Sequence, residues 1–210
     1  MVVGGERREY VRRRDDVAGD DVGGIWYRIG VDTSIATSVR RARLSDAAAL
    51  AQLVNRAFSV EQWISDDPRT SADEIAALIA SSCVLVLEGA GGIAAVVVVQ
   101  GLTARSERAP RHAYLGMLSV APELQGMGLG RRLVRVAEAM AEAGGASAMT
   151  LRIMSLREEL GRWYKSLGYR ETGTSPCTGQ ALKRPCHFIE MAKPLVPAAP
   201  RYEVGAVGAA

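Results

Sequence analysis

The feature that most constrains this chain is a strand-like segment that runs into a glycine-rich turn and then into a helix-like segment. The apolar residues Ala113–Val120 predict a buried strand, which Pro122 ends. The turn that follows has the sequence Gln125-Gly126-Met127-Gly128-Leu129-Gly130. Beyond it, Leu133 and Met140 recur at helical spacing, up to the helix-ending pair Gly144-Gly145. The pattern predicts a strand, a turn and an amphipathic helix in immediate succession.

A glycine-rich turn at a helix N-terminus is suited to binding an anion. The first backbone N–H groups of a helix have no intrahelical partner, and the helix dipole adds partial positive charge. Glycines at 126, 128 and 130 let a phosphate approach the backbone without interference from a Cβ atom, and Arg131 and Arg132 add charge. The turn therefore predicts a site for a phosphate-bearing ligand. The alternative is a plain strand–turn–helix in which the glycines serve tight packing.

The spacing of the glycines distinguishes among the known phosphate loops. No Gly-Lys-Ser/Thr follows, as a Walker loop requires, and Arg131 stands where a dinucleotide-binding turn needs its third glycine. Gln-x-x-Gly-x-Gly after a strand that ends in Val-x-Pro instead resembles the acyl-CoA pyrophosphate loop of the GNAT N-acetyltransferase superfamily. A second segment, Arg162-Trp163-Tyr164-Lys165-Ser166-Leu167-Gly168-Tyr169, resembles the family's YEKLGF element.

The order of the expected elements agrees with this resemblance, which covers roughly Ser38–Leu195. Strands are expected at Ser38–Arg43, Cys83–Glu88, Ile93–Gln100, Ala113–Val120, Ala148–Ser155, Tyr169–Gly173 and His187–Ala192. Helices are expected at Asp46–Ala57 with Ser45 as its cap, from a capping box at Ser71 to about Ala80, after the glycine turn, and at Leu156–Leu167. The order predicts a mixed α/β (α+β) fold. The resemblance implies the GNAT fold, a mixed central sheet flanked by helices, with a splayed central strand.

Length and composition fit one domain with terminal extensions. The chain has 210 residues, 48% of them hydrophobic, so it can bury a full core, and its net charge of +3 does not indicate nucleic-acid binding. Residues 1–36 mix Arg, Asp and Gly without periodicity and predict a disordered leader, with a start-site artefact or a nucleic-acid arm as alternatives. We expect the domain at 37–196 and a flexible tail at 197–210.

Targeting and cysteine patterns favour a cytoplasmic protein. No apolar run approaches the ~20 residues of a membrane span, and the N-terminus lacks the apolar stretch of a secretion signal. The cysteines, Cys83, Cys177 and Cys186, are odd in number and lack metal-ligand spacing. We therefore expect reduced thiols and no metal. A pairing of Cys177 and Cys186 across a hairpin is the alternative.

The resemblance implies that acetyl-CoA binds along the central strand and the turn. In the family, the end of the central strand splays from its neighbour, and free backbone groups, here on Leu118 and Val120, pair with the pantetheine arm as a strand would. Backbone N–H groups over Gly126–Arg131 would bind the pyrophosphate. The cofactor-binding residues implied are Leu118, Ser119, Val120, Gln125, Gly126, Met127, Gly128, Leu129, Gly130 and Arg131.

The same resemblance implies two catalytic groups. The backbone N–H of Val120 matches the donor to the tetrahedral oxyanion. Tyr164 matches the general acid, because a tyrosine of pKa about 10 stays protonated at neutral pH and can donate to a thiolate of pKa about 8.5. Position alone gives Tyr164 a second interpretation, since it shares a helix face with Leu160 and Leu167 and would then be a core aromatic.

No general base is assigned from the sequence. An alkyl amine has a pKa of about 10.4 and must lose a proton before it attacks. Some family members carry a glutamate on the central strand, six positions before its last residue; here that position is Tyr114, which either relays a proton through water or lines the acceptor pocket. We expect His112 to be a surface histidine at the strand start. We expect Glu61 to be a solvated loop carboxylate, with acceptor binding as its alternative role.

The expected acceptor pocket is framed by the loop Val60–Arg69, Tyr114 and an irregular segment at Thr174–Pro185. Trp63 in this loop either stacks on a substrate or packs the loop down. The loop carries three carboxylates beside Arg69, which hints at a cationic amine as substrate; they belong to Glu61, Asp66 and Asp67.

The predicted function is that of an N-acetyltransferase. By its family resemblance, the chain would move an acetyl group from acetyl-CoA to a primary amine of a small molecule or peptide by direct attack. One alternative is a non-catalytic acyl-CoA-binding sensor or regulatory module, which the missing strand glutamate favours. Another alternative is acetylation of a macromolecule, protein or tRNA, which only the arginine-rich leader supports. A homodimer is common in the family, although no residue here indicates it.

Overall fold

The computed structural model describes residues 38–101, 112–177 and 182–195. The leader expected over 1–36 and the tail expected over 197–210 lie outside these ranges. Seven strands form one mixed sheet in the order β1-β2-β3-β4-β5-β7-β6. They are β1 (Ser38–Arg41), β2 (Cys83–Gly89), β3 (Gly92–Gln100), β4 (His112–Val120), β5 (Ala148–Met154), β6 (Arg170–Pro176) and β7 (His187–Pro194). The pair β4–β5 is parallel and the other neighbours are antiparallel, so the mixed α+β expectation is confirmed.

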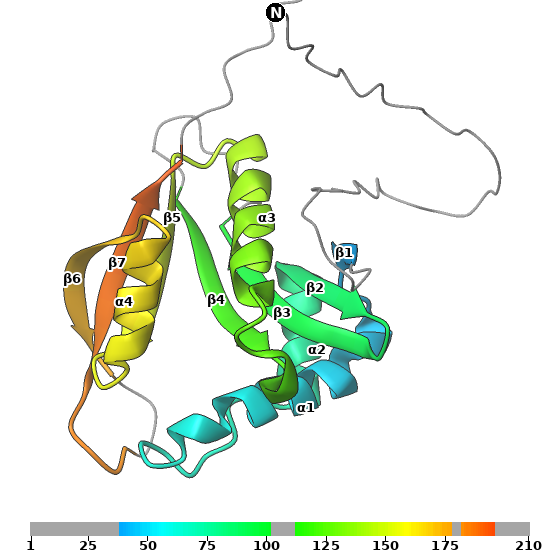
Figure 1. Ribbon diagram of the computed structural model, residues 1–210, viewed down its shortest axis with the longest axis horizontal. Coiled ribbons are helices and arrows are strands. Elements are labelled where there is room, and N and C mark those ends of the chain that lie inside the picture. Colours follow the sequence, from blue (N-terminus) through cyan, green and yellow to red (C-terminus); the bar gives the residue numbers. More distant parts are fainter. Residues whose placement is uncertain (1–37, 102–111, 178–181, 196–210) are drawn as a thin grey trace, which may run out of the picture.

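Four helices cover the sheet (Figure 1). They are α1 (Ala47–Phe58), α2 (Ala72–Ser81), α3 (Leu129–Ala143) and α4 (Glu158–Ser166). The strands β2 and β3 are buried on both faces, because alternate residues pack in two separate clusters: Val86 and Val96 with α1 and α2, Leu85 and Val97 with α3. This double burial explains why both strands read as continuous apolar runs in the sequence.

The other half of the sheet, β5, β7 and β6, is covered on one face only. In β5 the buried residues Met149, Leu151 and Ile153 alternate with Thr150, Arg152 and Met154, which are not fully buried. The buried set packs in the same cluster as Tyr164 of α4 and Met191 of β7. The opposite face of β5, with Arg152, is therefore available to line a site.

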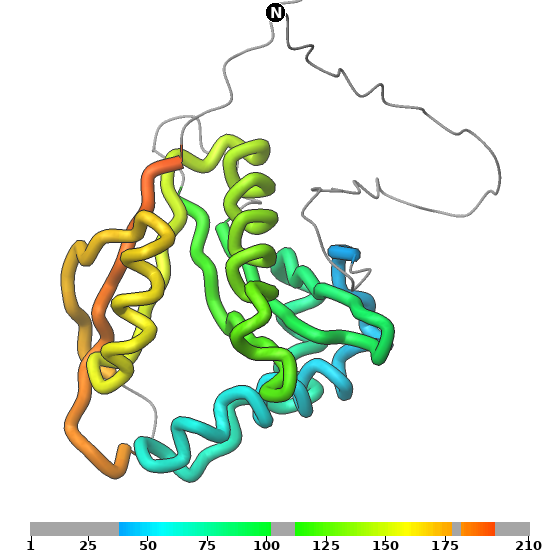
Figure 2. Tube along the Cα trace, in the orientation of Figure 1, coloured from blue at the N-terminus to red at the C-terminus, as the bar shows by residue number. Residues whose placement is uncertain are grey.

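The central strand splays away from its parallel neighbour, as expected (Figure 2). The β4–β5 ladder holds only His112–Tyr114 against Ala148–Thr150, and β4 then continues to Val120 beside β3 alone. A bulge helps to bend β4: Val96 faces Ser119 and Val98 faces Gly116, so β4 carries one extra residue there. Met117, inside this bulge, has a φ of 50°, in the left-handed region. The lower ends of β4 and β5 thus leave an opening between them.

The start of α1 differs from the sequence expectation. The sequence predicts Ser45 as the cap, but a 3₁₀ turn over Leu44–Asp46 precedes the helix, and Asp46 is the residue that caps the chain reversal. Its carboxylate accepts a hydrogen bond from the backbone N–H of Arg43 at 2.7 Å. The expected cap is wrong because Ser45 lies inside the 3₁₀ turn, where Asp46 and not Ser45 accepts the local backbone hydrogen bond. Asp46 also accepts a hydrogen bond from Arg40, six residues earlier.

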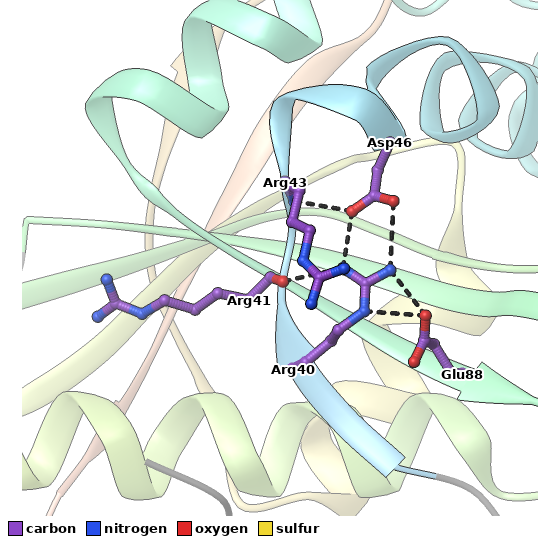
Figure 3. Close-up of polar contacts among 5 residues, drawn as sticks. All are labelled: Arg40, Arg41, Arg43, Asp46 and Glu88. Atoms are coloured by element: carbon purple, nitrogen blue, oxygen red, sulfur yellow. Dashed lines mark hydrogen bonds and ion pairs between the residues drawn. The ribbon is translucent and has the colours of Figure 1, made fainter. Parts of the chain in front are cut away.

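Arg40 joins β1, the start of α1 and β2 in one polar cluster (Figure 3). Its guanidinium donates to Asp46 Oδ2 at 2.7 Å and to Glu88 Oε1 at 2.8 Å. The side chains of Arg40 and Asp46 are only 11% and 14% exposed. These hydrogen bonds from Arg40 lower the pKa of the Asp46 carboxyl. The cluster fixes the edge strand to the rest of the sheet.

Two local predictions are confirmed by geometry. At the expected capping box, Ser71 Oγ accepts from the Glu74 N–H at 3.2 Å and Glu74 Oε2 accepts from the Ser71 N–H at 2.9 Å. Gly89 pairs with Gly92, so the β2–β3 connection is a two-residue hairpin turn.

The β6–β7 hairpin differs from the expected irregular segment at Thr174–Pro185. Thr174–Pro176 continue β6 and pair with β7, the last pair being Pro176 with His187. Cys177 and Cys186 are the next residues on the two strands, so they face each other across the hairpin as free cysteines. Burial and the neighbouring Cys177 thiol raise the pKa of the Cys186 thiol. The two cysteines thus meet in space, as the alternative interpretation expected, but both are in the thiol form.

Neither a membrane-spanning helix nor a metal cluster occurs in the described ranges. None of the helices there is both long and apolar enough to cross a membrane. Over the same residues, no group of three or more His, Cys, Asp or Glu side chains is placed to hold a metal ion.

Candidate active site

The glycine turn adopts the backbone that an anion site needs. Gly126 and Gly128 both have a φ of 78°, in the left-handed region that favours glycine. The helix α3 begins at Leu129, and its first intrahelical bond runs from the Arg132 N–H to the Gly128 carbonyl at 3.0 Å. The N–H groups of residues 129–131 therefore have no partner within the helix.

The three glycines of the turn differ in the space around their Cα atoms. A Cβ atom built on Gly126 or Gly128 would meet nothing within 4 Å, so the space above both is open to a ligand. A Cβ on Gly130 would lie 3.5 Å from Val120 Cγ2 and 3.7 Å from Trp163 Cζ2. These are ordinary van der Waals distances, so a Cβ atom at Gly130 would pack beside Val120 and Trp163 without a clash. The open space fits the ligand interpretation for Gly126 and Gly128.

The end of β4 presents backbone groups toward the opening. Ala121 donates its N–H to the Ala94 carbonyl at 2.9 Å, which makes the neighbouring pair Val120–Ala95 a non-hydrogen-bonded one. The N–H and C=O of Val120 therefore point away from β3, toward the side that β5 has left. Leu118 has the same parity. The Val120 carbonyl accepts a bond from Gln125 Nε2 at 3.2 Å, which fastens the glycine turn to the strand.

A cavity of about 900 Å³ lies over this strand end and the glycine turn. Its lining includes nine of the ten cofactor-binding residues implied by the sequence, namely Leu118, Ser119, Val120, Gln125, Gly126, Gly128, Leu129, Gly130 and Arg131. The tenth, Met127, is 52% exposed and does not line it. Glu61, Trp63 and Arg157 complete one wall. The volume and the anion-ready backbone suit a large ligand with a phosphate end.

A second cavity, of about 320 Å³, lies in the opening between β4 and β5. Tyr114 and Met117 of β4, Met154 of β5 and Tyr164 of α4 are among the residues that line it. Five residues line both cavities: Phe58, Glu61, Leu118, Leu160 and Trp163. The two cavities therefore adjoin at these five residues, which we call the neck.

Tyr164 has features of both roles that the sequence left open. Its side chain packs edge-on against Trp163 and Tyr169, with ring centroids 4.7 and 5.5 Å apart, and it is only 6% exposed. It also lines the smaller cavity. Burial, with a smaller contribution from Tyr114, raises the pKa of Tyr164, so the hydroxyl keeps its proton at neutral pH.

Glu61 is not the solvated loop carboxylate expected from the sequence. It ends a 3₁₀ turn after α1, pairs with Arg157 just before α4, and both side chains are 14% exposed. Burial raises the pKa of Glu61, although the Arg157 and Arg69 charges act to lower it. Arg157 also pairs with Glu159. The sequence contained no local signal for Arg157, because its partner lies 96 residues earlier in the chain.

The segment before β7 contacts the loop between α1 and α2. The Lys183 ammonium donates to Asp66 Oδ1 at 2.5 Å and to the Gln62 carbonyl at 2.8 Å, and the Lys183 N–H donates to the Ile64 carbonyl at 2.8 Å. Arg184 lies over the ring of Trp63, 5.4 Å from its centroid. These cations offset the negative bias of the α1–α2 loop on which the hint of a cationic substrate rested.

The other residues considered from the sequence, Trp63, Tyr114 and His112, do not lie together. Trp63 is 42% exposed and lines the larger cavity, away from Tyr114, which lines only the smaller one. Its contact with Arg184 agrees with the loop-packing interpretation. His112 is exposed at the start of β4, as expected, and borders neither cavity.

Solved structures share this architecture. The yncA protein from Salmonella typhimurium, solved with its cofactor acetyl-CoA, is 25% identical, with a TM-score of 0.61 over 78% of this chain and 99% of that chain. Two others show the fold: smu.2055 from Streptococcus mutans UA159 (18% identity, TM-score 0.64, 76% and 99% covered) and the ribosomal-protein-S18-alanine N-acetyltransferase from Escherichia coli (22%, 0.59, 79% and 98%).

The sequence itself matches a family model but no curated protein. The acetyltransferase (GNAT) family model matches residues 47–169, more than half of the 210 residues. With its splayed central strand, glycine turn and paired cavities, the chain belongs to the GNAT acetyltransferase family.

Proposed function

We propose that this protein is an N-acetyltransferase that moves the acetyl group of acetyl-CoA to a primary amine. The observation that carries the proposal is the neck between the two cavities. The larger cavity has a turn suited to phosphate at one end and β4 backbone groups that do not pair with β3 at the other, and the smaller one adds room for a second substrate. The similarity to yncA, solved with acetyl-CoA, supports the identity of the first substrate.

Acetyl-CoA fits the larger cavity in one direction. Its pyrophosphate would lie on the N–H groups of residues 129–131, over the open positions of Gly126 and Gly128. Its pantetheine arm would pair with Leu118 and Val120 in the place that β5 has left. The thioester then lies at the neck, beside the residues that line both cavities.

The reaction requires one bond to form and one to break. The neutral amine nitrogen attacks the thioester carbonyl carbon, and the Val120 N–H donates to the oxygen that becomes negative. The tetrahedral intermediate collapses when the C–S bond breaks. Tyr164 donates its proton to the leaving sulfur, which departs as the CoA thiol. The attacking nitrogen loses one proton, which passes to the Tyr164 phenolate and restores the starting charge.

Calorimetric titration of acetyl-CoA into the full chain is the first test. We expect binding at micromolar concentration, similar binding of desulfo-CoA, which keeps the pyrophosphate and pantetheine, and none of NAD. An amine panel followed by thiol release then tests catalysis. Binding without thiol release for any amine would favour the non-catalytic acyl-CoA sensor, and absence of binding would reject the proposal.

A further inference from the structure

The smaller cavity carries two arginines that have no carboxylate partner. Arg69 lies over the ring of Phe58, 5.1 Å from its centroid, and Arg152 lies over Phe188 at 4.9 Å and Tyr114 at 5.8 Å. Within the described residues neither forms an ion pair, although Glu190 is the register neighbour of Arg152 on β7. A guanidinium stacked on a ring keeps the N–H groups at its edge free to bind an anion.

This pairing pattern differs from that of Arg157 and Lys183. Arg157 is engaged by Glu61 and Glu159, and Lys183 by Asp66. The two arginines of the smaller cavity instead lie over aromatic rings, and among the described residues no carboxylate lies within ion-pair distance of either. An anionic group entering this cavity would find two guanidinium groups whose N–H groups are not taken up by an ion pair.

A carboxylate that could bind a protonated amine lies at the neck. Glu61 lines both cavities, and only one of its oxygens is bonded, to Arg157, among the described residues. Arg69 is close enough for its charge to act on Glu61. A carboxylate and a cation so near each other match a ligand that carries an ammonium and a carboxylate on neighbouring atoms.

Size and lining limit what else the ligand carries. The cavity measures about 320 Å³, at the small end of ligand sites. Apart from the charged groups, its walls are mostly apolar and aromatic, with Tyr114, Met117, Met154 and Phe188 among them. Such a space suits one compact apolar side chain better than a long polycation, whose second ammonium would face Arg69 and Arg152.

We propose that the acetyl acceptor is a free amino acid with an apolar side chain: its amine lies at Glu61 in the neck, and its carboxylate is bound by Arg69 and Arg152. The inference rests on the proposed function, because it names the second substrate of that reaction. In this reaction the thioester C–S bond breaks, the N–C bond of an N-acetylamino acid forms, and the CoA thiol is released. Starting from the α-ammonium form of the amino acid, one proton is also released.

The test compares molecules that differ only at the carboxylate. Thiol release from acetyl-CoA is measured with the twenty common L-amino acids, and then with L-phenylalanine, L-phenylalaninamide and phenethylamine, and with L-leucine, L-leucinamide and isoamylamine. Spermidine and a tetrapeptide represent the cationic and peptide alternatives. We expect at least one apolar amino acid to exceed its amide and its decarboxylated amine by about tenfold or more in kcat/KM.

Two variants locate the preference. Arg152→Gln should lower kcat/KM for the amino acid by about tenfold or more and leave the amide nearly unchanged, so that the ratio of the two collapses. Arg170→Gln on β6, an exposed arginine of the same sheet half that borders neither cavity, should keep the ratio. A merely structural effect of the Arg152 change would lower both substrates alike.

The outcomes separate this inference from the proposed function. Faster turnover of amides, decarboxylated amines, spermidine or the peptide than of every amino acid would overturn the inference and leave the acetyltransferase proposal standing. Binding of acetyl-CoA with no turnover of any amino acid would overturn it as well. If acetyl-CoA itself does not bind in the titration, the inference and the proposed function are both rejected. An unchanged acid-to-amide ratio in Arg152→Gln would reject the assigned carboxylate site.

Discussion

Gly128 and Gly145 have nearly the same backbone conformation at opposite ends of α3. Their φ values are 78° and 81°, and a Cβ atom on either would meet nothing within 4 Å. Only Gly128 borders the larger cavity. The pair therefore separates the cost of a side chain in the left-handed region from the cost of blocking a phosphate.

Gly128→Val should weaken acetyl-CoA binding by at least about tenfold, because its side chain would occupy the space above the first N–H groups of α3. Both Gly128→Val and Gly145→Val should lose about 1–2 kcal/mol of unfolding free energy, since valine disfavours a positive φ. Titration calorimetry and urea denaturation measure the two effects. Equal acetyl-CoA affinity in Gly128→Val and the wild type would show that the turn is purely structural.

Two buried tyrosines allow an equally close comparison for the general acid. Tyr164 lines the smaller cavity, whereas Tyr169, whose ring centroid is 5.5 Å away, borders neither cavity. Tyr164→Phe should lower kcat by about a hundredfold with little change in acetyl-CoA affinity, because the ring stays and only the proton donor is lost. Tyr169→Phe should keep kcat. If Tyr164→Phe turns over at the wild-type rate, Tyr164 is a core residue and another group supplies the proton.

At the scale of elements, the edge strand β1 depends on one charged cluster. Arg40 bonds to Asp46 at the start of α1 and to Glu88 on β2, and its side chain is 11% exposed. Hydrogen bonds of this kind to charged groups contribute about 1.5–3 kcal/mol each. The cluster thus couples three elements whose backbone pairing alone is short, since β1 has four residues.

This coupling predicts a dependence of stability on pH. The pKa of Asp46 is lowered from its ordinary value near 3.8, mainly by the hydrogen bond from Arg40. The unfolded chain therefore takes up a proton before the folded one, so the stabilisation is complete above pH 3.8 and is lost as the pH falls through the lowered pKa.

Asp46→Asn should consequently be less stable than the wild type at pH 7, and the difference should shrink as the pH approaches about 3. Urea midpoints at the two pH values measure this. Asp67→Asn, at an exposed loop carboxylate, serves as the control and should differ little from the wild type at either pH. A constant gap between Asp46→Asn and the wild type would contradict the cluster's role.

At the scale of the whole molecule, the site depends on the opening between β4 and β5, which separates two halves of the sheet. The short β4–β5 ladder joins the halves at one end, and Arg157–Glu61 and Lys183–Asp66 join them at the other. Behind the opening, Lys193 of β7 donates to Glu138 of α3 at 2.7 Å. These contacts keep β4 and β5 apart without letting the halves separate.

Lys193→Met should destabilise the fold by about 1–3 kcal/mol, because it leaves Glu138, whose side chain is 12% exposed, without its cation. Glu138→Gln in the same chain should restore part of the loss. The control is Lys165→Met, since Lys165 and Glu171 are 55% and 49% exposed and such pairs contribute less than about 1 kcal/mol. Urea denaturation measures the free energy of unfolding of each variant. Equal losses in Lys165→Met and Lys193→Met would contradict a stabilising contact between the two halves of the sheet.

Local sequence determined those parts of the protein in which the interacting residues are neighbours in the chain. The Ser71–Glu74 capping box, the Gly89–Gly92 hairpin and the strand–turn–helix around Gly128 all follow from spacings of a few residues. In each, the backbone conformation is fixed by a hydrogen bond or by a positive φ that the residue types themselves select. The family and the backbone of the glycine turn could therefore be predicted from the amino-acid sequence alone.

Tertiary structure alone decided the charges of the site. Glu61 changes from a loop carboxylate to a buried ion pair because Arg157 reaches it across 96 positions, and Asp66 is neutralised by Lys183 across 117. Arg69 and Arg152 come to one cavity from the α1–α2 loop and from β5. No spacing in the sequence encodes these meetings, since they depend on how far β4 splays from β5. The charge balance around the smaller cavity is thus decided by the tertiary structure, whereas the glycine turn follows from the local sequence.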